Sequence, residues 1–348
     1  MTVHPLPAWV EPRHARSLAE ASARLRAWSL CLHGDLRAAF EAMAATTGAG
    51  AAQGAEAYLS PVSQPVVLLP LWLSAGLADQ VVVDLLGSAL AGYLAVRVQD
   101  DWCDRGTGDA RCAMVLSAAL LARHAALAGQ HAVGQDYWKL HADHWERYAT
   151  AMSAEQHLAA GDGAFGEAEF QRVLDRSRPV VLPGAAALAL TGRWNQVHDL
   201  ASWVDAVVAA HQRFDDLRDG LEDLQAGLRT MVLAQSGART PGQWVAWLAS
   251  GGASVELAMA DRELAQAQGI AQRMGMPEAA PWISARRAAM VAWQARWQSG
   301  PLAGLIDLQL RDWKIISRSL SHQDGAASRT FGPRAGDPRS KQTGPRND

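Results

Sequence analysis

The sequence predicts an all-α protein, and three observations lead to this prediction. Alanine and leucine dominate the 348 residues, whereas runs of β-branched residues are few and short. Apolar residues recur at spacings of three and four along most of the chain, which is the period of an amphipathic helix. No stretch shows the alternating pattern of a half-buried strand. We therefore expect one domain built from helices alone.

Stretches rich in Gly, Pro and Ser separate the expected helices. TTGAGAAQG ends the first helix, GTGD the third and AAGDGAFG the fifth, while SGARTPG precedes the ninth and SGGAS ends it. The helical period between these stretches predicts helices at residues 14–46, 62–77, 79–104, 109–130, 134–158, 166–177, 179–191, 195–226, 240–250, 252–275, 277–299 and 301–320.

Three segments are expected along the chain. Residues 1–54 form an N-terminal helical segment, and residues 55–321 form the main helical domain, with no linker long enough to divide it. From about residue 322 the composition shifts to a tail with little apolar surface to bury, HQDGAASRTFGPRAGDPRSKQTGPRND. Such a composition predicts disorder for residues 322–348.

Charge, cysteine content and hydropathy restrict the setting in which the protein works. The formal charge of −3 gives no general attraction to nucleic acid or anionic membranes. Three cysteines form neither an even framework nor a CxxC pair, and no secretory pattern opens the chain, so we expect a cytoplasmic protein. The most apolar stretches, 66–78 and 81–96, are shorter than the roughly 20 residues of a bilayer span, so no membrane span is expected.

Two acidic clusters carry the strongest chemical signal in the sequence. The first, QDDWCD, contains Asp100, Asp101 and Asp104. The second, FDDLRDGLED, repeats this spacing with Asp215, Asp216 and Asp219, and then adds Glu222 and Asp223. Side chains four residues apart share a helix face, so each cluster predicts a stripe of carboxylates on its helix.

Two such stripes facing each other would repel strongly unless a cation lay between them. Magnesium prefers oxygen ligands, takes one or two carboxylates per ion and completes its shell with water and phosphate. Inward carboxylates on facing helices are a known way of building metal sites in bundles. The pair of clusters therefore predicts a magnesium site that binds a diphosphate.

A single DDxxD on a solvated helix face would be an unremarkable charge run. Here, however, eight acids stand against Arg218 alone within the two spans, whereas surface runs usually mix signs. Each cluster also follows an apolar helical stretch, as expected for a helix that emerges from a core. These features favour a functional pair over two solvated faces.

With these motifs the sequence resembles the class I isoprenoid synthase superfamily, which comprises trans-prenyltransferases and class I terpene synthases. The resemblance covers roughly residues 55–320 and implies a single-domain helical bundle with a central apolar cavity. It also implies three Mg²⁺ ions bound together with a prenyl diphosphate. By position, the implied metal ligands are Asp100, Asp104, Asp215, Asp219 and Asp223, with Asp101 and Asp216 as accessory acids.

The segment EFQRVLDRSRPVVLPGAAALALTG is similar to the family segment that supplies a Lys-Thr contact to the diphosphate. Here it offers Arg176, Ser177 and Arg178 instead. The planar guanidinium can bind two phosphate oxygens, so Arg176 and Arg178 are the expected cationic catalytic residues. Arg178 is favoured because Pro179 restricts it and starts a new helix.

One departure from the family favours one of its two branches. Chain-elongating members bind a second diphosphate through a basic segment before the first motif, but residues 38–96 contain no Lys or Arg. Losing that site while keeping the metal site predicts a terpene synthase that ionises and cyclises one linear prenyl diphosphate. Two alternatives stay open: a prenyltransferase with an unusual acceptor site, and a non-catalytic partner subunit that binds prenyl diphosphate.

The residues around the motifs predict the cavity and its substrate. Small residues one and two turns before Asp100 indicate a deep pocket, which favours geranylgeranyl diphosphate or a longer substrate, with farnesyl diphosphate as the alternative. Aromatic faces can stabilise the carbocation. The expected cavity residues are Gly92, Tyr93, Ala95, Val96, Trp102 and Phe214. The resembled family often forms dimers, so a homodimer is one expected assembly.

Two further features are expected to play no part in this chemistry. Cys103 lies between acids that disfavour its thiolate, so it is expected to be a bystander. The His pair of HADH, His141 and His144, lacks the HExxH spacing of a zinc site and is expected on a solvated helix face.

Overall fold

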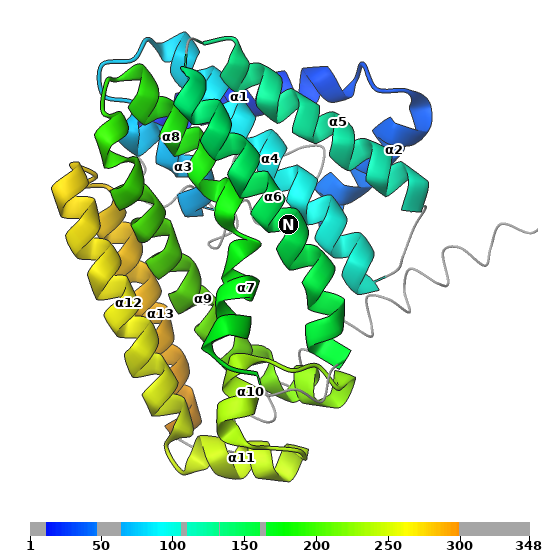
Figure 1. The fold of residues 1–348 in the computed structure, drawn as a ribbon, viewed down its shortest axis with the longest axis vertical. Coiled ribbons are helices and arrows are strands. Elements are labelled where there is room, and N and C mark those ends of the chain that lie inside the picture. The colour runs from blue at the N-terminus through cyan, green and yellow to red at the C-terminus, as the bar shows by residue number, and fades with distance from the viewer. Residues whose placement is uncertain (1–11, 47–63, 106–109, 132, 161–164, 299–348) are drawn as a thin grey trace, which may run out of the picture. The chain divides into compact units, whose positions relative to one another are not determined.

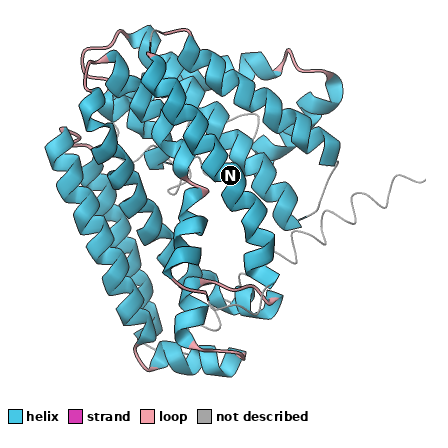
Figure 2. Cartoon of the chain, viewed as in Figure 1, coloured by secondary structure: helices cyan, strands magenta, loops and turns pink. Residues whose placement is uncertain are grey.

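The computed structural model describes residues 12–46, 64–105, 110–131, 133–160 and 165–298. Throughout these ranges the regular structure is helical and no strand occurs (Figure 2). This confirms the all-α prediction.

Thirteen α-helices and two short 3₁₀ turns, η2 and η3, follow one another in the described part of the chain. Their bounds are α1 Pro12–Ser29, α2 Gly34–Thr46, α3 Gln64–Leu73, α4 Asp79–Arg105, α5 Ala110–Gly129, α6 Gln135–Ala160, α7 Glu167–Asp175, η2 Arg178–Val180, α8 Val181–Leu190, η3 Trp194–Gln196, α9 Val197–Ala226, α10 Met231–Ser236, α11 Pro241–Ala249, α12 Gly252–Met274 and α13 Ala279–Gln298.

Most helices lie where the sequence predicts them, with two differences. The predicted helix 14–46 is interrupted after Ser29, because Cys31 and Leu32 turn back by bonds to carbonyls three residues earlier. Helix α10 was not predicted, since it is only six residues long and begins at a Thr230 cap that accepts a hydrogen bond from Leu233 N. The predicted helix 301–320 and the tail at 322–348 lie outside the described residues.

Helices α4 and α9 are the long elements about which the others pack (Figure 1). Helix α4 contacts α1, α3, α5 and α8, while α9 contacts α7, α8, α10, α11 and α12. Helix α8 is almost entirely apolar and buried from Val181 to Leu188. It contacts both α4 and α9, so the two helices that carry the acidic motifs share a common packing partner.

Tryptophan and close glycine contacts tie α9 to its neighbours. Trp203 on α9 meets Trp72 on α3 and Trp282 on α13, with ring centroids 6.0 and 6.3 Å apart. On α8, a Cβ at Gly184 would come within 3.0 Å of Leu200, so a larger residue would force α8 and α9 apart. Much of the tryptophan content therefore serves packing.

Among the described residues, two helices are long and apolar enough to cross a bilayer by length and composition. The sequence did not predict this, because the apolar stretches considered there, 66–78 and 81–96, are shorter. The span Asp79–Asp100 of α4 is continuous, and 78% of its residues are buried against other helices. Packing within the protein therefore accounts for its apolar character. Helix α5 differs, because only 33% of its span is buried.

The described residues up to Ala295 form one unit of mutual contacts. Within this unit, α1 lies against α4, where Arg24 pairs with the buried Asp84 at 3.3 Å and donates to Gln80 at 2.9 Å. The N-terminal helices are thus packed onto the main helical region.

Candidate metal and diphosphate site

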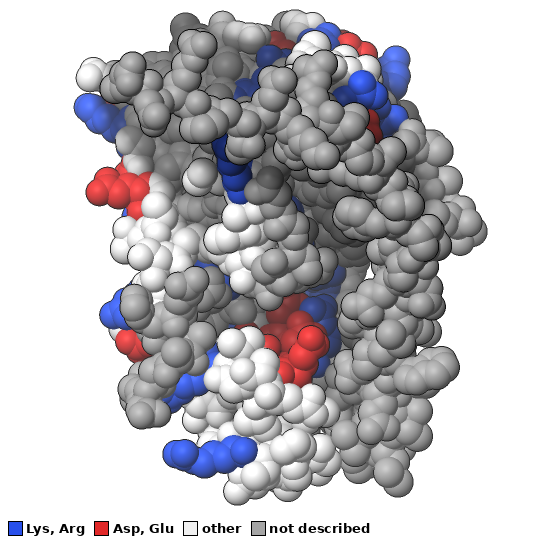
Figure 3. Space-filling view, turned by 90° about the vertical axis from the view of Figure 1, so that its right-hand side faces the viewer, with Lys and Arg blue, Asp and Glu red and all other residues white. Residues whose placement is uncertain are grey.

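A cavity of about 700 Å³ brings parts of both acidic motifs together. Helix α9 lines it with all five acids of the second motif, and α4 contributes Cys103 from the first motif. Gln212 and Ala226 of α9 also line it. The remaining lining residues come from α6, α7 and the segments that follow or precede α7 and precede α10: Met152, Phe165, Phe170, Val173, Arg176, Leu228, Arg229 and Thr230. On the face shown in Figure 3, acidic side chains gather in a hollow with basic side chains beside them.

Close packing against α11 holds the second motif in place. Gly220 lies within the motif and is buried, and a Cβ there would overlap the indole of Trp244 on α11. Helix α9 ends at Gly227 in the left-handed conformation, with φ 71°, and the chain then turns into α10. A glycine suits both positions, one for space and one for conformation.

One guanidinium neutralises two of the predicted metal ligands. Arg218 binds Asp219 with both arms of its fork, through Nε at 2.8 Å and Nη2 at 2.7 Å. Its Nη1 lies 3.2 Å from Oδ1 of Asp215. Asp215 and Asp219, which the sequence places on one helix face, therefore share this guanidinium, and the charge of Arg286 also acts on Asp215.

Three further acids of the second motif line the same cavity: Asp216, Glu222 and Asp223. Burial raises the pKa of Asp216 to about 6, although its carboxylate accepts a hydrogen bond from Gln212 at 2.7 Å. Burial, together with Asp216, Asp219 and Glu222, raises the pKa of Asp223 to about 7. Burial also raises the pKa of Asp215. The carboxylates thus repel one another, as their spacing predicts.

Two arginines line the same cavity, and the one favoured from the sequence is not among them. Arg176 and Arg229 line it, and the charge of Arg176 acts on Asp216. Arg178 instead binds Asp175 at 3.0 Å and Asp205 at 2.7 Å. The structure therefore places Arg176, rather than Arg178, beside the acids. Arg229 had no motif around it and was missed.

The first motif follows a polar link between three helices. Gln99 on α4 donates to Ser117 of α5 at 2.7 Å and accepts from Tyr148 of α6 at 2.5 Å. Asp100 follows directly and lies 3.7 Å from Arg97. One turn later Cys103 lines the cavity, and its expected role as a chemical bystander stays a prediction. The side chains of Asp101 and Asp104 lie outside the described part of the structure.

The apolar part of the cavity comes from residues that the sequence did not single out. Phe165 precedes α7, Phe170 and Val173 lie on α7, and Met152 comes from α6. Arg213 lies 4.6 Å from the ring centroid of Phe170. Since one face of Phe170 already carries a cation, Phe165 is the better candidate for a ring that faces a carbocation.

None of the six predicted cavity residues is among those that line this cavity: Gly92, Tyr93, Ala95, Val96, Trp102 and Phe214. Gly92 faces α5, where a Cβ would lie 3.0 Å from Nδ1 of His124. Phe214 packs against Trp293 of α13, with centroids 5.9 Å apart. Trp102 is 41% exposed. The helical spacing gave these residues a place near the motifs but not the direction in which each side chain points.

The HADH histidines also differ from their expected solvated position. His144 is buried and donates from Nδ1 to the carbonyl oxygen of Arg178 at 2.8 Å. His141 stacks on the buried His124, with centroids 5.4 Å apart. Burial lowers the pKa of His141 to about 4, and His124 and His144 contribute to the shift. These histidines are neutral parts of the packing between α5 and α6.

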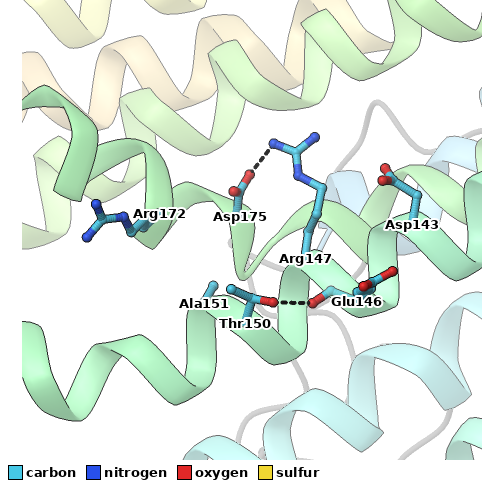
Figure 4. A pocket seen from close by; sticks show the side chains of 7 residues that line it. All are labelled: Asp143, Glu146, Arg147, Thr150, Ala151, Arg172 and Asp175. Atoms are coloured by element: carbon cyan, nitrogen blue, oxygen red, sulfur yellow. Dashed lines mark hydrogen bonds and ion pairs between the residues drawn. The ribbon is translucent and has the colours of Figure 1, made fainter.

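A second cavity of about 350 Å³ lies between α6 and α7 (Figure 4). Asp143, Glu146 and Asp175 line it together with Arg147 and Arg172. Arg147 is bound to Asp175 at 2.7 Å. Three carboxylates against two guanidinium groups give a negative site, which does not favour a second diphosphate.

The donor chemistry of the first cavity fits magnesium, but its present arrangement does not yet form a metal site. Carboxylate oxygens are the ligands that Mg²⁺ prefers. Among the side chains that the structure describes, however, no three from His, Cys, Asp or Glu are gathered closely enough to hold a metal ion. Both oxygens of Asp219 are instead in contact with Arg218.

Neither a known protein family nor a curated protein matches the chain. The assignment of function therefore rests on the fold and on this cavity.

Proposed function

We propose that the protein is a Mg²⁺-dependent class I terpene synthase of the isoprenoid synthase type. Its substrate would be one linear prenyl diphosphate. The preference for geranylgeranyl or longer over farnesyl rests on the small residues before Asp100 in the sequence, which do not line this cavity. The observation that carries this proposal is the cavity in which five acids of one motif meet a residue of the other motif, two arginines and an apolar wall.

The residues of the cavity divide between the two ends of such a substrate. Asp215, Asp219 and Asp223, with Asp100 and Asp104 from α4, would hold the metal ions. Bound magnesium would act as a Lewis acid on the diphosphate leaving group. Arg176 and Arg229 line the same space and would bind the diphosphate oxygens directly.

The reaction would begin when the allylic carbon–oxygen bond breaks and its electron pair leaves with the diphosphate. The prenyl cation left behind needs a dry, apolar wall, because water would capture it. Phe165, Val173 and Met152 supply apolar surface at the cavity. Cyclisation would end with loss of a proton or capture of water.

The distribution of cations supports one substrate rather than two. The stretch at residues 38–96 lacks Lys and Arg, and the neighbouring cavity at α6 and α7 carries more acids than arginines. A prenyltransferase would need a cationic site for its second diphosphate. Neither region offers one, although an uncharged acceptor would not require it.

The setting of the protein belongs to the same proposal. Cys31, Cys103 and Cys112 form no disulfide, which agrees with a reducing cytoplasm. The expected partners are the prenyl diphosphate and a second copy of the chain, with no role for nucleic acid. The exposed apolar surface of α5 is available for such a homodimer.

Incubation with magnesium and each of geranyl, farnesyl, geranylgeranyl and geranylfarnesyl diphosphate tests the proposal. Gas chromatography with mass detection should reveal a hydrocarbon or alcohol from one substrate, lost in Asp100→Ala and Asp219→Ala. A product formed only with added isopentenyl diphosphate would favour the prenyltransferase. Activity that appears only with a second protein would favour the partner subunit. Absence of product and of released diphosphate in all of these mixtures would refute the proposal.

A further inference from the structure

Arg218 binds the carboxylate oxygens of two of the expected metal ligands on α9. Its fork contacts both oxygens of Asp219 at 2.7 and 2.8 Å, and its third nitrogen lies 3.2 Å from Asp215. Those two acids are the first two members of the stripe Asp215, Asp219 and Asp223, whose residues lie four apart on α9. A metal ion bound to the same oxygens would overlap the guanidinium and be repelled by its charge.

We infer that Arg218 is an internal counter-ion that holds Asp215 and Asp219 in the metal-free site and must leave them when Mg²⁺ binds. This inference rests on the proposed function, because it assigns the metal to the same carboxylates. It explains why no three ligands are gathered among the described side chains although the donors lie along one helix face.

The geometry supports a contact that can open rather than a fixed structural pair. Residues i and i+1 do not face each other on a helix, so Arg218 has to fold back along the surface to reach Asp219. Its side chain is 34% exposed, and those of Asp215 and Asp219 are 35% and 40% exposed. Arg213, by contrast, is buried against Glu256 at 3.1 Å and cannot leave without exposing that charge.

Release of Arg218 has a consequence for the order of binding. The freed guanidinium stays on α9 beside the cavity, where the diphosphate offers it phosphate oxygens in place of the carboxylates. Magnesium alone must therefore break the pair without compensation, whereas magnesium with diphosphate replaces it. Metal and diphosphate are then expected to bind cooperatively.

Titration calorimetry of the full chain with Mg²⁺, with and without inorganic pyrophosphate, measures this coupling. The native protein should bind Mg²⁺ weakly alone and more tightly with pyrophosphate. Arg218→Gln should bind Mg²⁺ alone about three- to tenfold more tightly, since the competing cation is gone, and should lose most of the gain from pyrophosphate. Arg218→Lys keeps the charge without the fork and should fall between, which also covers a Gln variant that does not fold.

Arg287→Gln is the matched control, because Arg287 forms the same forked pair with Asp261, at 2.5 and 2.8 Å, between α13 and α12. It should leave Mg²⁺ affinity unchanged. Equal tightening in both Gln variants would indicate a general charge effect and overturn the inference. The inference would also be overturned if the native protein binds Mg²⁺ with pyrophosphate but neither Arg218 variant changes the Mg²⁺ affinity. In that case the proposed function would stand. No Mg²⁺ binding with pyrophosphate in any form would overturn both.

Discussion

At the scale of single residues, the space around Gly220 shows how firmly the second motif is fixed. The indole of Trp244 fills the position that a side chain would need. The glycine therefore lets α11 pack closely against α9 within the motif, on a helix face that Gly220 shares with Asp216 four residues earlier. Gly269 is also within a helix, but the nearest atom to its missing Cβ is Nη1 of Arg273 at 3.9 Å.

Gly220→Ala should lower the free energy of unfolding by about 1–3 kcal/mol, because Trp244 must move. Gly269→Ala is the control and should raise it by up to about 1 kcal/mol, since alanine costs less backbone entropy in an open helical position. Urea unfolding followed by circular dichroism measures both. Equal changes in the free energy of unfolding in the two variants would show that packing against Trp244 does not determine the effect of Gly220→Ala.

Asp223 gives a pH dependence with a defined sign. Its pKa of about 7 lies above the unfolded value of 3.8, so the folded protein binds the proton more tightly. The resulting cost to stability is fully present above about pH 7 and disappears as the pH falls towards 3.8.

Asp223→Asn should therefore raise the melting temperature in EDTA at pH 8 and have little effect at pH 4. Asp136→Asn is the control, since Asp136 is 70% exposed and pairs with Lys139 at the surface. It should show no such difference between the two pH values. A gain for Asp223→Asn that is equal at both pH values would contradict the burial and repulsion assigned to this carboxylate.

Residue identity and spacing could predict the carboxylate stripe, because acids four apart on a helix share a face. They could not predict the Arg218 pairing with Asp219, since neighbours in sequence do not face each other on a helix. Phe165 and Arg229 were missed for a different reason. They reach the cavity through the course of the chain between helices, which no local pattern encodes.

At the scale of elements, a buried ion group joins α9 to α12. Arg213 lies 3.1 Å from Glu256 and 3.0 Å from Glu263, and Glu256 is only 1% exposed. Burial raises the pKa of both glutamates. The same guanidinium stacks on Phe170, so it also connects the pair of helices to the cavity wall on α7.

Arg213→Leu should destabilise the protein by about 3 kcal/mol at pH 8, because it takes this counter-ion from the buried Glu256 and the partly buried Glu263. This loss of stability should be smaller at pH 5. Without Arg213 the two glutamates bind protons more tightly in the folded protein than in the unfolded chain, and protonation removes the cost of their unpaired charge. Arg273→Leu is the control, since its pair with Asp199 is 3.6 Å long and Arg273 is 63% exposed. A similar loss in both variants would argue against a special role for burial.

Long periodic elements could be predicted from the sequence, whereas short or interrupted ones could not. Helices α4, α9 and α12 lie within a few residues of their predicted bounds, since each carries many turns of the apolar period. Helix α10 has fewer than two turns, so packing and the Thr230 cap decide its formation. The break between α1 and α2 lies in a turn whose residues carry no Pro and precede Gly34.

At the scale of the whole molecule, the apolar surface of α5 bears on the expected homodimer. Met114 is 67% exposed and Val115 41% exposed on this helix. A homodimer that uses α5 would bury them.

Met114→Glu should then convert a dimer to a monomer, because a buried unpaired carboxylate opposes association. Light scattering after size-exclusion chromatography measures the mass. Val255→Glu on α12, where the native side chain is 61% exposed, is the control and should leave the mass unchanged. A native protein that is monomeric at every concentration would contradict the homodimer, and a dimer unaffected by Met114→Glu would place its interface elsewhere.

We propose that carboxylates of α4 and α9 hold divalent metal ions together with a diphosphate. A crystal structure with Mn²⁺ and pyrophosphate, examined by anomalous scattering at the manganese edge, tests it most directly. We expect manganese peaks between Asp100 or Asp104 and the stripe Asp215, Asp219 and Asp223, with pyrophosphate near Arg176 and with Arg218 turned away from Asp219. A cavity without manganese, with Arg218 still bound to Asp219 at saturating Mn²⁺ and pyrophosphate, would contradict it.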